Sequence, residues 1–131
     1  MSDENLWGDI DQIPEVNSPK SILKEQAAFL DAKTNHILHG VVDDRTEHNR
    51  FVFDLDIVVP SLNDYRYTVL TVSHGIDLYP VSIESSGAPR GPNGSMFDCD
   101  DEDEFKKALA TILTSPRTKK VIASLLSQAK A

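Results

Sequence analysis

Residues 50–59 read RFVFDLDIVV, the most regular alternation of apolar and polar side chains in the chain. Because successive side chains of a strand point to opposite faces, this period of two predicts a β-strand with one face in a core. The opposite, outer face carries the polar and smaller side chains, namely Val52, Asp54, Asp56 and Val58. Burying a large apolar side chain stabilises a fold by about 1.5–3 kcal/mol, so we expect the following four to be less than about 10% exposed: Phe51, Phe53, Leu55 and Ile57.

Three further segments extend this strand into a sheet. Residues 37–42, 66–73 and 78–85 have strand-like patterns and are joined to their neighbours by short polar connections, one of them at 43–49. Short connections predict an antiparallel meander of four strands. Aligning the apolar sides, because a slip by one residue would scatter them over both faces, pairs the residues as follows: Ile57 with Thr68, Leu55 with Leu70, Phe53 with Val72, Leu70 with Val81, and Val72 with Tyr79.

Helices flank this sheet in the sequence. Ser18 followed by Pro19 is typical of a helix start, and apolar residues at three- and four-residue spacing follow to about Thr34. A second helix is predicted after Asp101, which forms a capping box with Glu104, and a third after residues 115–116, which read Ser-Pro. The sequence therefore predicts an α+β fold, one helix, a four-stranded antiparallel meander and two C-terminal helices, packed as a two-layer single domain over residues 18–131.

Two segments lack such patterns. Residues 1–17 form an acidic arm, in which we expect the apolar Leu6 and Trp7 to pack on the domain and pin the arm in place. Residues 85–97 contain three glycines and two prolines and predict a flexible loop. The spacing of these glycines does not fit a phosphate-binding loop, and no lysine follows them.

The negative charge of the chain is concentrated in two places. Residues 1–16 carry five acids and no base, and residues 98–104 carry six acids and no base, whereas the whole 131-residue chain has a net charge of −8. Nucleic acids and anionic membranes are themselves negatively charged, so we expect neither as a partner. A single cysteine and the lack of a secretory signal or membrane-spanning run favour a cytoplasmic protein, and no motif calls for a cofactor.

The second acidic segment is the main candidate for a binding site. Carboxylates stabilise the first turn of a helix, but the segment has more of them than a cap needs: Asp98, Asp100, Asp101, Glu102, Asp103 and Glu104. It does not match a calcium-binding EF-hand loop, because the sixth residue is Asp103 and the twelfth is Leu109. The sequence favours a non-catalytic binding module for a basic protein, such as an inhibitor, an immunity-type protein or a chaperone.

An apolar patch on the outer sheet face is a second candidate for partner binding. In the register above, this face collects Val58, Tyr67 and Val69, together with Ile37, Val41 and Val52. Exposed patches of this kind usually mark an interface. We expect the arm, a second copy in a homodimer, or another protein to cover it.

A small metal-dependent hydrolase is the alternative function. Asp54 and Asp56 emerge about 7 Å apart on one face of their strand, and His39 pairs beside Asp54 in the predicted register. Two carboxylates and one imidazole are fewer ligands than a hard cation prefers. His36 and His39 do not form a zinc pair, because three residues apart on a strand they point to opposite faces. Cys99 lies among carboxylates that disfavour its thiolate, so we do not expect it to be a nucleophile.

Overall fold

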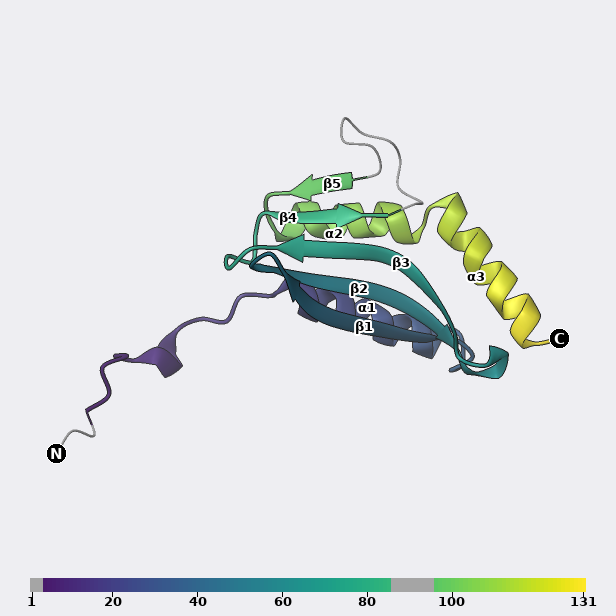
Figure 1. Cartoon of the computed structure of the whole chain (residues 1–131), viewed down its shortest axis with the longest axis horizontal. Helices are drawn as coiled ribbons and strands as arrows, with labels where there is room; N and C mark the ends of the chain where they lie inside the picture. The colour runs from purple at the N-terminus through teal and green to yellow at the C-terminus, as the bar shows by residue number, and fades with distance from the viewer. Residues whose placement is uncertain (1–3, 86–95) are drawn as a thin grey trace.

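The computed structural model describes residues 4–85 and 96–131. Three helices and a five-stranded antiparallel sheet form a single domain, which confirms the predicted α+β class (Figure 1). The main elements are α1 (Pro19–Lys33), β1 (His39–Glu47), β2 (Arg50–Val59), β3 (Tyr65–His74), β4 (Val81–Glu84), β5 (Met96–Cys99), α2 (Glu102–Leu113) and α3 (Pro116–Ala129). Short 3-10 turns, η1 (Ile10–Gln12) and η2 (Pro60–Leu62), lie in the arm and before β3.

The strands follow one another across the sheet in chain order, β1-β2-β3-β4-β5, each antiparallel to the next. In Figure 1, α1 and α2 lie behind the sheet, so the helices cover one face of it. The fifth strand was not predicted. It pairs with β4 and takes up the end of the predicted loop 85–97, while residues 86–95 of that loop lie outside the described residues.

The helix-facing side of β2 forms the centre of the core. Phe53, Leu55 and Ile57 are 6%, 5% and 2% exposed, as the alternation predicts. The expectation for Phe51 is wrong, since its side chain is 38% exposed. Phe51 lies at the hairpin end of the strand and contacts the ring of His74, with the ring centroids 5.5 Å apart.

The hairpin between β1 and β2 is tighter than predicted. Most of the segment 43–49 belongs to β1, and only His48 and Asn49 form the turn. Both residues have positive φ, 50° and 63°, as the two central residues of a type I′ hairpin require.

A β-bulge changes the faces on which part of β3 lies. The predicted pairs Leu55 with Leu70 and Phe53 with Val72 are confirmed, but Ile57 faces Tyr67 instead of Thr68. The register shifts between Leu55 and Asp56, so that Val69 is an extra residue in β3. A bulge of this kind turns the following side chains by one position. Val69 is consequently buried in the core, and Tyr67 packs against it from the helix side.

The pairing of β3 with β4 is displaced by four residues from the prediction. Val72 faces Ile83 and His74 faces Val81, because β4 begins only after Pro80. A displacement by an even number of residues leaves the same side chains on the core face. Val81 and Ile83 are accordingly 1% and 0% exposed.

The helices begin at side-chain caps. The hydroxyl oxygen of Ser18 accepts a hydrogen bond from the backbone N–H of Ser21 at 3.1 Å, and Asp101 and Ser115 cap α2 and α3 in the same way. Helix α3 buries only Thr118 and Leu125 and projects at one end of the molecule (Figure 1).

Candidate functional site

The acidic segment 98–104 spans the end of β5 and the start of α2. Asp101 is the N-cap of α2, and its carboxylate accepts a hydrogen bond of 2.9 Å from the N–H of Glu104. Glu102 forms an ion pair of 2.8 Å with Lys106, one helical turn further on. Asp100 and Asp103, by contrast, are exposed. Part of the segment therefore builds the helix start, and the rest presents charge at the surface.

The two acidic segments meet in the folded chain. The Asn17 side-chain amide donates a hydrogen bond of 3.3 Å to Glu102, and the hydroxyl of Tyr79 donates one of 3.4 Å to the Asn17 carbonyl. Asn17 is the last residue of the arm. These contacts place the root of the arm against the start of α2, so the two anionic segments adjoin at one end of the molecule.

Two groups at this end have raised pKa values, chiefly because they are removed from water and secondly because carboxylates lie nearby. Burial, followed by the charges of Glu104 and Asp98, raises the pKa of the Cys99 thiol to about 11. Burial, followed by Glu102, raises the pKa of Tyr79 to about 12. Cys99 is 2% exposed, and because the thiolate is the reactive form, the raised pKa disfavours reaction of this thiol at neutral pH.

The arm projects from the domain instead of packing on it (Figure 1). Leu6 and Trp7 are 86% and 79% exposed, so the expectation that they pin the arm is wrong. The side chain of Asn5 folds this part of the arm locally. It accepts from the N–H of Trp7 at 2.9 Å and donates to the carbonyl of Gly8 at 3.0 Å. Ile10, Ile13 and Val16 are also exposed, and carboxylates alternate with them along the arm.

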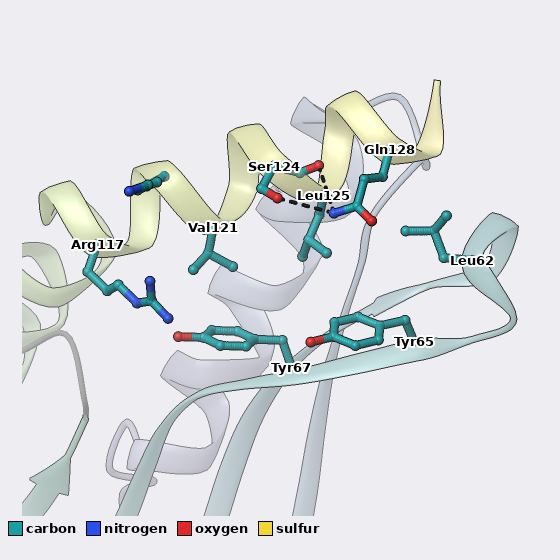
Figure 2. A pocket seen from close by; sticks show the side chains of 9 residues that line it. Leu62, Tyr65, Tyr67, Arg117, Val121, Ser124, Leu125 and Gln128 are labelled. Carbon is teal, nitrogen blue, oxygen red and sulfur yellow. Dashed lines mark hydrogen bonds between the residues drawn. The ribbon is translucent and has the colours of Figure 1, made fainter. Parts of the chain in front are cut away.

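A groove lies at the opposite end of the molecule, between α3 and the start of β3. Figure 2 shows Tyr65 and Tyr67 side by side on its floor, with α3 above them. The groove has a volume of about 510 Å³. It is lined by Leu62, Tyr65, Tyr67, Arg117, Lys120, Val121, Ser124, Leu125 and Gln128.

The bulge in β3 and the composition of α3 produce this groove. Beyond the bulge, Tyr67 and Tyr65 lie opposite Ile57 and Val59, on the side that faces the helices. Residues 115–131 carry four bases and no acid. Among the ion pairs of residues 4–85 and 96–131, none involves Arg117 or Lys120. The groove therefore combines aromatic surface with two cationic side chains that form no ion pair within the described part of the chain.

The outer sheet face carries a network of ion pairs. Arg66 pairs with Asp56 at 2.9 Å and also with Asp43, while Arg45 pairs with Asp54 at 2.5 Å. The side chain of Asp56 is 4% exposed, and its Oδ1 has no hydrogen-bond partner among residues 4–85 and 96–131. Arg45 and Arg66 lie opposite Val52 and Val58, so charged residues adjoin the valines that the sequence suggested were part of an apolar patch.

Three of the six residues predicted for that patch, Val58, Tyr67 and Val69, are not brought together. Val58 lies on the outer face opposite Arg66, whereas Val69 is in the core and Tyr67 lines the α3 groove. The placement of Tyr67 and Val69 on the outer face was therefore wrong, and the unrecognised bulge is the cause.

His39 does not lie beside Asp54, as the hydrolase alternative requires, because it pairs with Val58 across the sheet. The imidazole of His39 bonds to Asp31 at 2.6 Å, while Asp54 and Asp56 bond to arginines. His36 shares the Asp31 carboxylate, and the two histidines hold the pKa of Asp31 below its usual value. His36 and His39 were predicted to point to opposite faces of a strand, but both side chains contact Asp31. Within residues 4–85 and 96–131, no group of three or more His, Cys, Asp or Glu side chains is placed to hold a metal ion.

Sequence reasoning missed the α3 groove. The sequence patterns did not bring Arg117 and Lys120 together with Tyr65 and Tyr67, although all four line the groove. The available signal was a basic amphipathic helix without acids in a chain of net charge −8.

No family model matches the chain, and neither a curated protein nor a solved structure matches it. Among the described residues, the helices are too short or too polar to cross a membrane.

Proposed function

We propose that this chain is a non-catalytic protein-binding module that recognises a basic protein partner through its acidic end. The recognition surface consists of the arm, residues 4–17, and the exposed carboxylates of residues 98–104. Both belong to one surface because Asn17 bonds to Glu102. An inhibitor, an immunity-type protein or a chaperone would each use such a surface, and a cytoplasmic location is part of this proposal.

The exposure of Trp7 is the observation that carries the proposal. Isolated surface tryptophans are costly to leave in water, and tryptophan is among the residues enriched at the energetic centres of interfaces. Trp7 is 79% exposed and lies within a locally hydrogen-bonded turn, flanked by acids in sequence. An apolar anchor surrounded by carboxylates fits a partner with an apolar pocket and a basic rim.

Affinity capture with matched variants tests this function. The wild-type chain, immobilised through its C-terminus, is expected to retain a basic protein from native lysate and to release it at high salt. The variant Leu6→Ser with Trp7→Ser removes the anchor, and the variant Asp100→Asn with Asp103→Asn removes only exposed charge. We expect the first to lose the partner and the second to weaken its salt-sensitive retention. Equal retention by all three proteins would contradict the proposal.

A further inference from the structure

We infer that the groove between α3 and β3 binds the acidic arm of a second copy of this chain. The inference rests on the arm being a binding element, as proposed above, and it names a surface that the arm fits. The two features have complementary chemistry. The arm combines exposed apolar side chains with acids, and the groove combines exposed aromatic surface with bases.

Charge complementarity selects this groove among the hollows of the described surface. Arg117 and Lys120 lie three residues apart on α3, which places them as neighbours on one helix face. The ion pairs of the described residues leave both without a carboxylate partner. Asp9 and Asp11 of the arm carry two negative charges, which match the two positive charges of the groove, and both are exposed.

Apolar complementarity points the same way. Tyr65 is 51% exposed although it lies in a hollow, and Val121 is half-buried beside it. The floor of two tyrosines offers a flat aromatic surface at low entropic cost, which suits an indole ring. Trp7 precedes Asp9 by two residues, so an arm lying along α3 brings its ring over the tyrosines with its carboxylates near the bases.

Two other hollows that contain bases fit the arm less well. A hollow of about 450 Å³ on the other side of α3 is lined by apolar side chains and carries a single base, Lys33. A hollow near the root of the arm contains Lys20 and Arg45, but both already pair with carboxylates, Asp44 and Asp54 among them. Neither offers an unpaired pair of cations to the arm.

The second copy, and not the same chain, is the occupant because of where the two features lie. The arm leaves the domain at one end of the long axis, and α3 lies at the other end, with the sheet between them (Figure 1). Two copies placed antiparallel bring each arm to the groove of the other. This exchange is reciprocal, so a twofold pair closes without leaving an unoccupied arm or groove.

Trp7 is the only tryptophan of the chain, so its fluorescence reports the arm directly. We expect its emission to shift to shorter wavelength, and its quenching by iodide to fall, as protein concentration rises. High salt should reverse both changes. The variant Arg117→Glu with Lys120→Glu should lose the shift. The variant Lys119→Glu with Lys130→Glu is the matched control, because it makes the same change in charge on α3 and at its C-cap but outside the groove lining, and it should keep the shift.

Mixing two variants then tests whether the arm of one copy binds the groove of another. The anchor variant Leu6→Ser with Trp7→Ser has no tryptophan and an intact groove. The groove variant Arg117→Glu with Lys120→Glu has an intact Trp7. We expect neither to self-associate alone, and their mixture to form a one-to-one complex with shifted emission. Adding Asp9→Lys with Asp11→Lys to the groove variant should restore its self-association, because the charges of arm and groove are then both reversed. Misfolding could explain a loss of association but not this recovery.

Three results would overturn the inference. The first is a Trp7 emission that stays water-exposed at all concentrations. The second is a shift that is independent of concentration, since it would place the arm on its own chain. The third is a groove variant that associates like the wild type. If self-association fails but the groove variant still captures a basic partner, the inference is rejected and the proposed function stands. If partner capture is lost but the mixed variants still associate, only the proposed function is rejected.

Discussion

The Asp56 carboxylate shows how a single residue depends on one neighbour. It is almost completely buried on the outer face of the sheet, where Arg66 is its ion-pair partner and no described residue forms a hydrogen bond to its second oxygen. A buried charge without a partner is costly, more so than the loss of an exposed pair. The stability of this face should therefore depend on Arg66 far more than on Asp43, the exposed carboxylate that Arg66 also contacts.

We expect Arg66→Met to lower the urea midpoint of unfolding markedly, and Asp43→Asn to change it little. Adding Asp56→Val to Arg66→Met should recover much of the loss, because it removes the uncompensated charge. Chemical denaturation of the four proteins measures this. A double variant that is less stable than Arg66→Met would show that Asp56 contributes through packing and not through its charge.

Cys99 gives a second prediction for a single residue. Its thiol is buried, and burial together with the nearby carboxylates raises its pKa to about 11. The thiolate is the reactive form, so the native protein should react with a disulfide reagent at about pH 8 far more slowly than the unfolded chain. Following the colour of the released thiolate with and without guanidinium provides the comparison. Native reactivity equal to that of the unfolded chain would show that the start of α2 opens readily.

Helix α1 packs closely against β1 at Gly40. A Cβ atom added at Gly40 would lie 2.5 Å from the Cα of Ala27, a backbone atom that has no room to move aside. We expect Gly40→Ala to cost about 1–3 kcal/mol in the free energy of unfolding, because it forces the helix off the sheet. Gly75→Ala is the control, since nothing lies within 4 Å of its added Cβ. Equal stability of the two variants in thermal unfolding would contradict this close contact.

The start of α2 separates capping from surface charge. Replacing Asp101, whose carboxylate accepts from the N–H of Glu104, by Ala should cost about 0.5–2 kcal/mol. Replacing the exposed Asp103 by Asn should leave stability within about 0.5 kcal/mol of the wild type. If both variants unfolded at the same denaturant concentration, the cap would have no special role.

Elements that depend on interactions between neighbours in the chain could be predicted from the sequence. Features that depend on contacts between distant segments could not. The cap Ser18 and the alternation of β2 depend on neighbours in the chain, so α1 and β2 were found close to their observed bounds. The bulge at Val69 and the pairing of β4 depend on contacts between distant strands. The fifth strand is four residues long and follows a Gly- and Pro-rich segment, so its pattern was too short to recognise.

The same distinction holds for the surfaces of the whole molecule. The acidic segments were visible as runs of one charge, but their meeting at Asn17 and Glu102 is a tertiary contact. The α3 groove joins Tyr65 and Tyr67 to residues about fifty positions later in the chain, and it exists only because the bulge turns those tyrosines towards the helices. The charge of the molecule is therefore unevenly distributed along its long axis. The acidic arm lies at one end and the basic helix α3 at the other (Figure 1).

This arrangement predicts that the domain does not need its arm for folding. The apolar side chains of the arm are exposed, and its hydrogen bonds to the domain come from Asn17. Removing residues 1–16 while keeping Asn17 should therefore change the free energy of unfolding by less than about 0.5 kcal/mol in dilute solution, as for other surface changes. Urea unfolding followed by circular dichroism measures this without the lost Trp7. At high protein concentration the truncated chain should be less resistant than the wild type, because binding between copies stabilises only the folded form that carries an arm. A loss of more than about 1 kcal/mol in dilute solution would mean that Leu6 and Trp7 pack on their own domain after all.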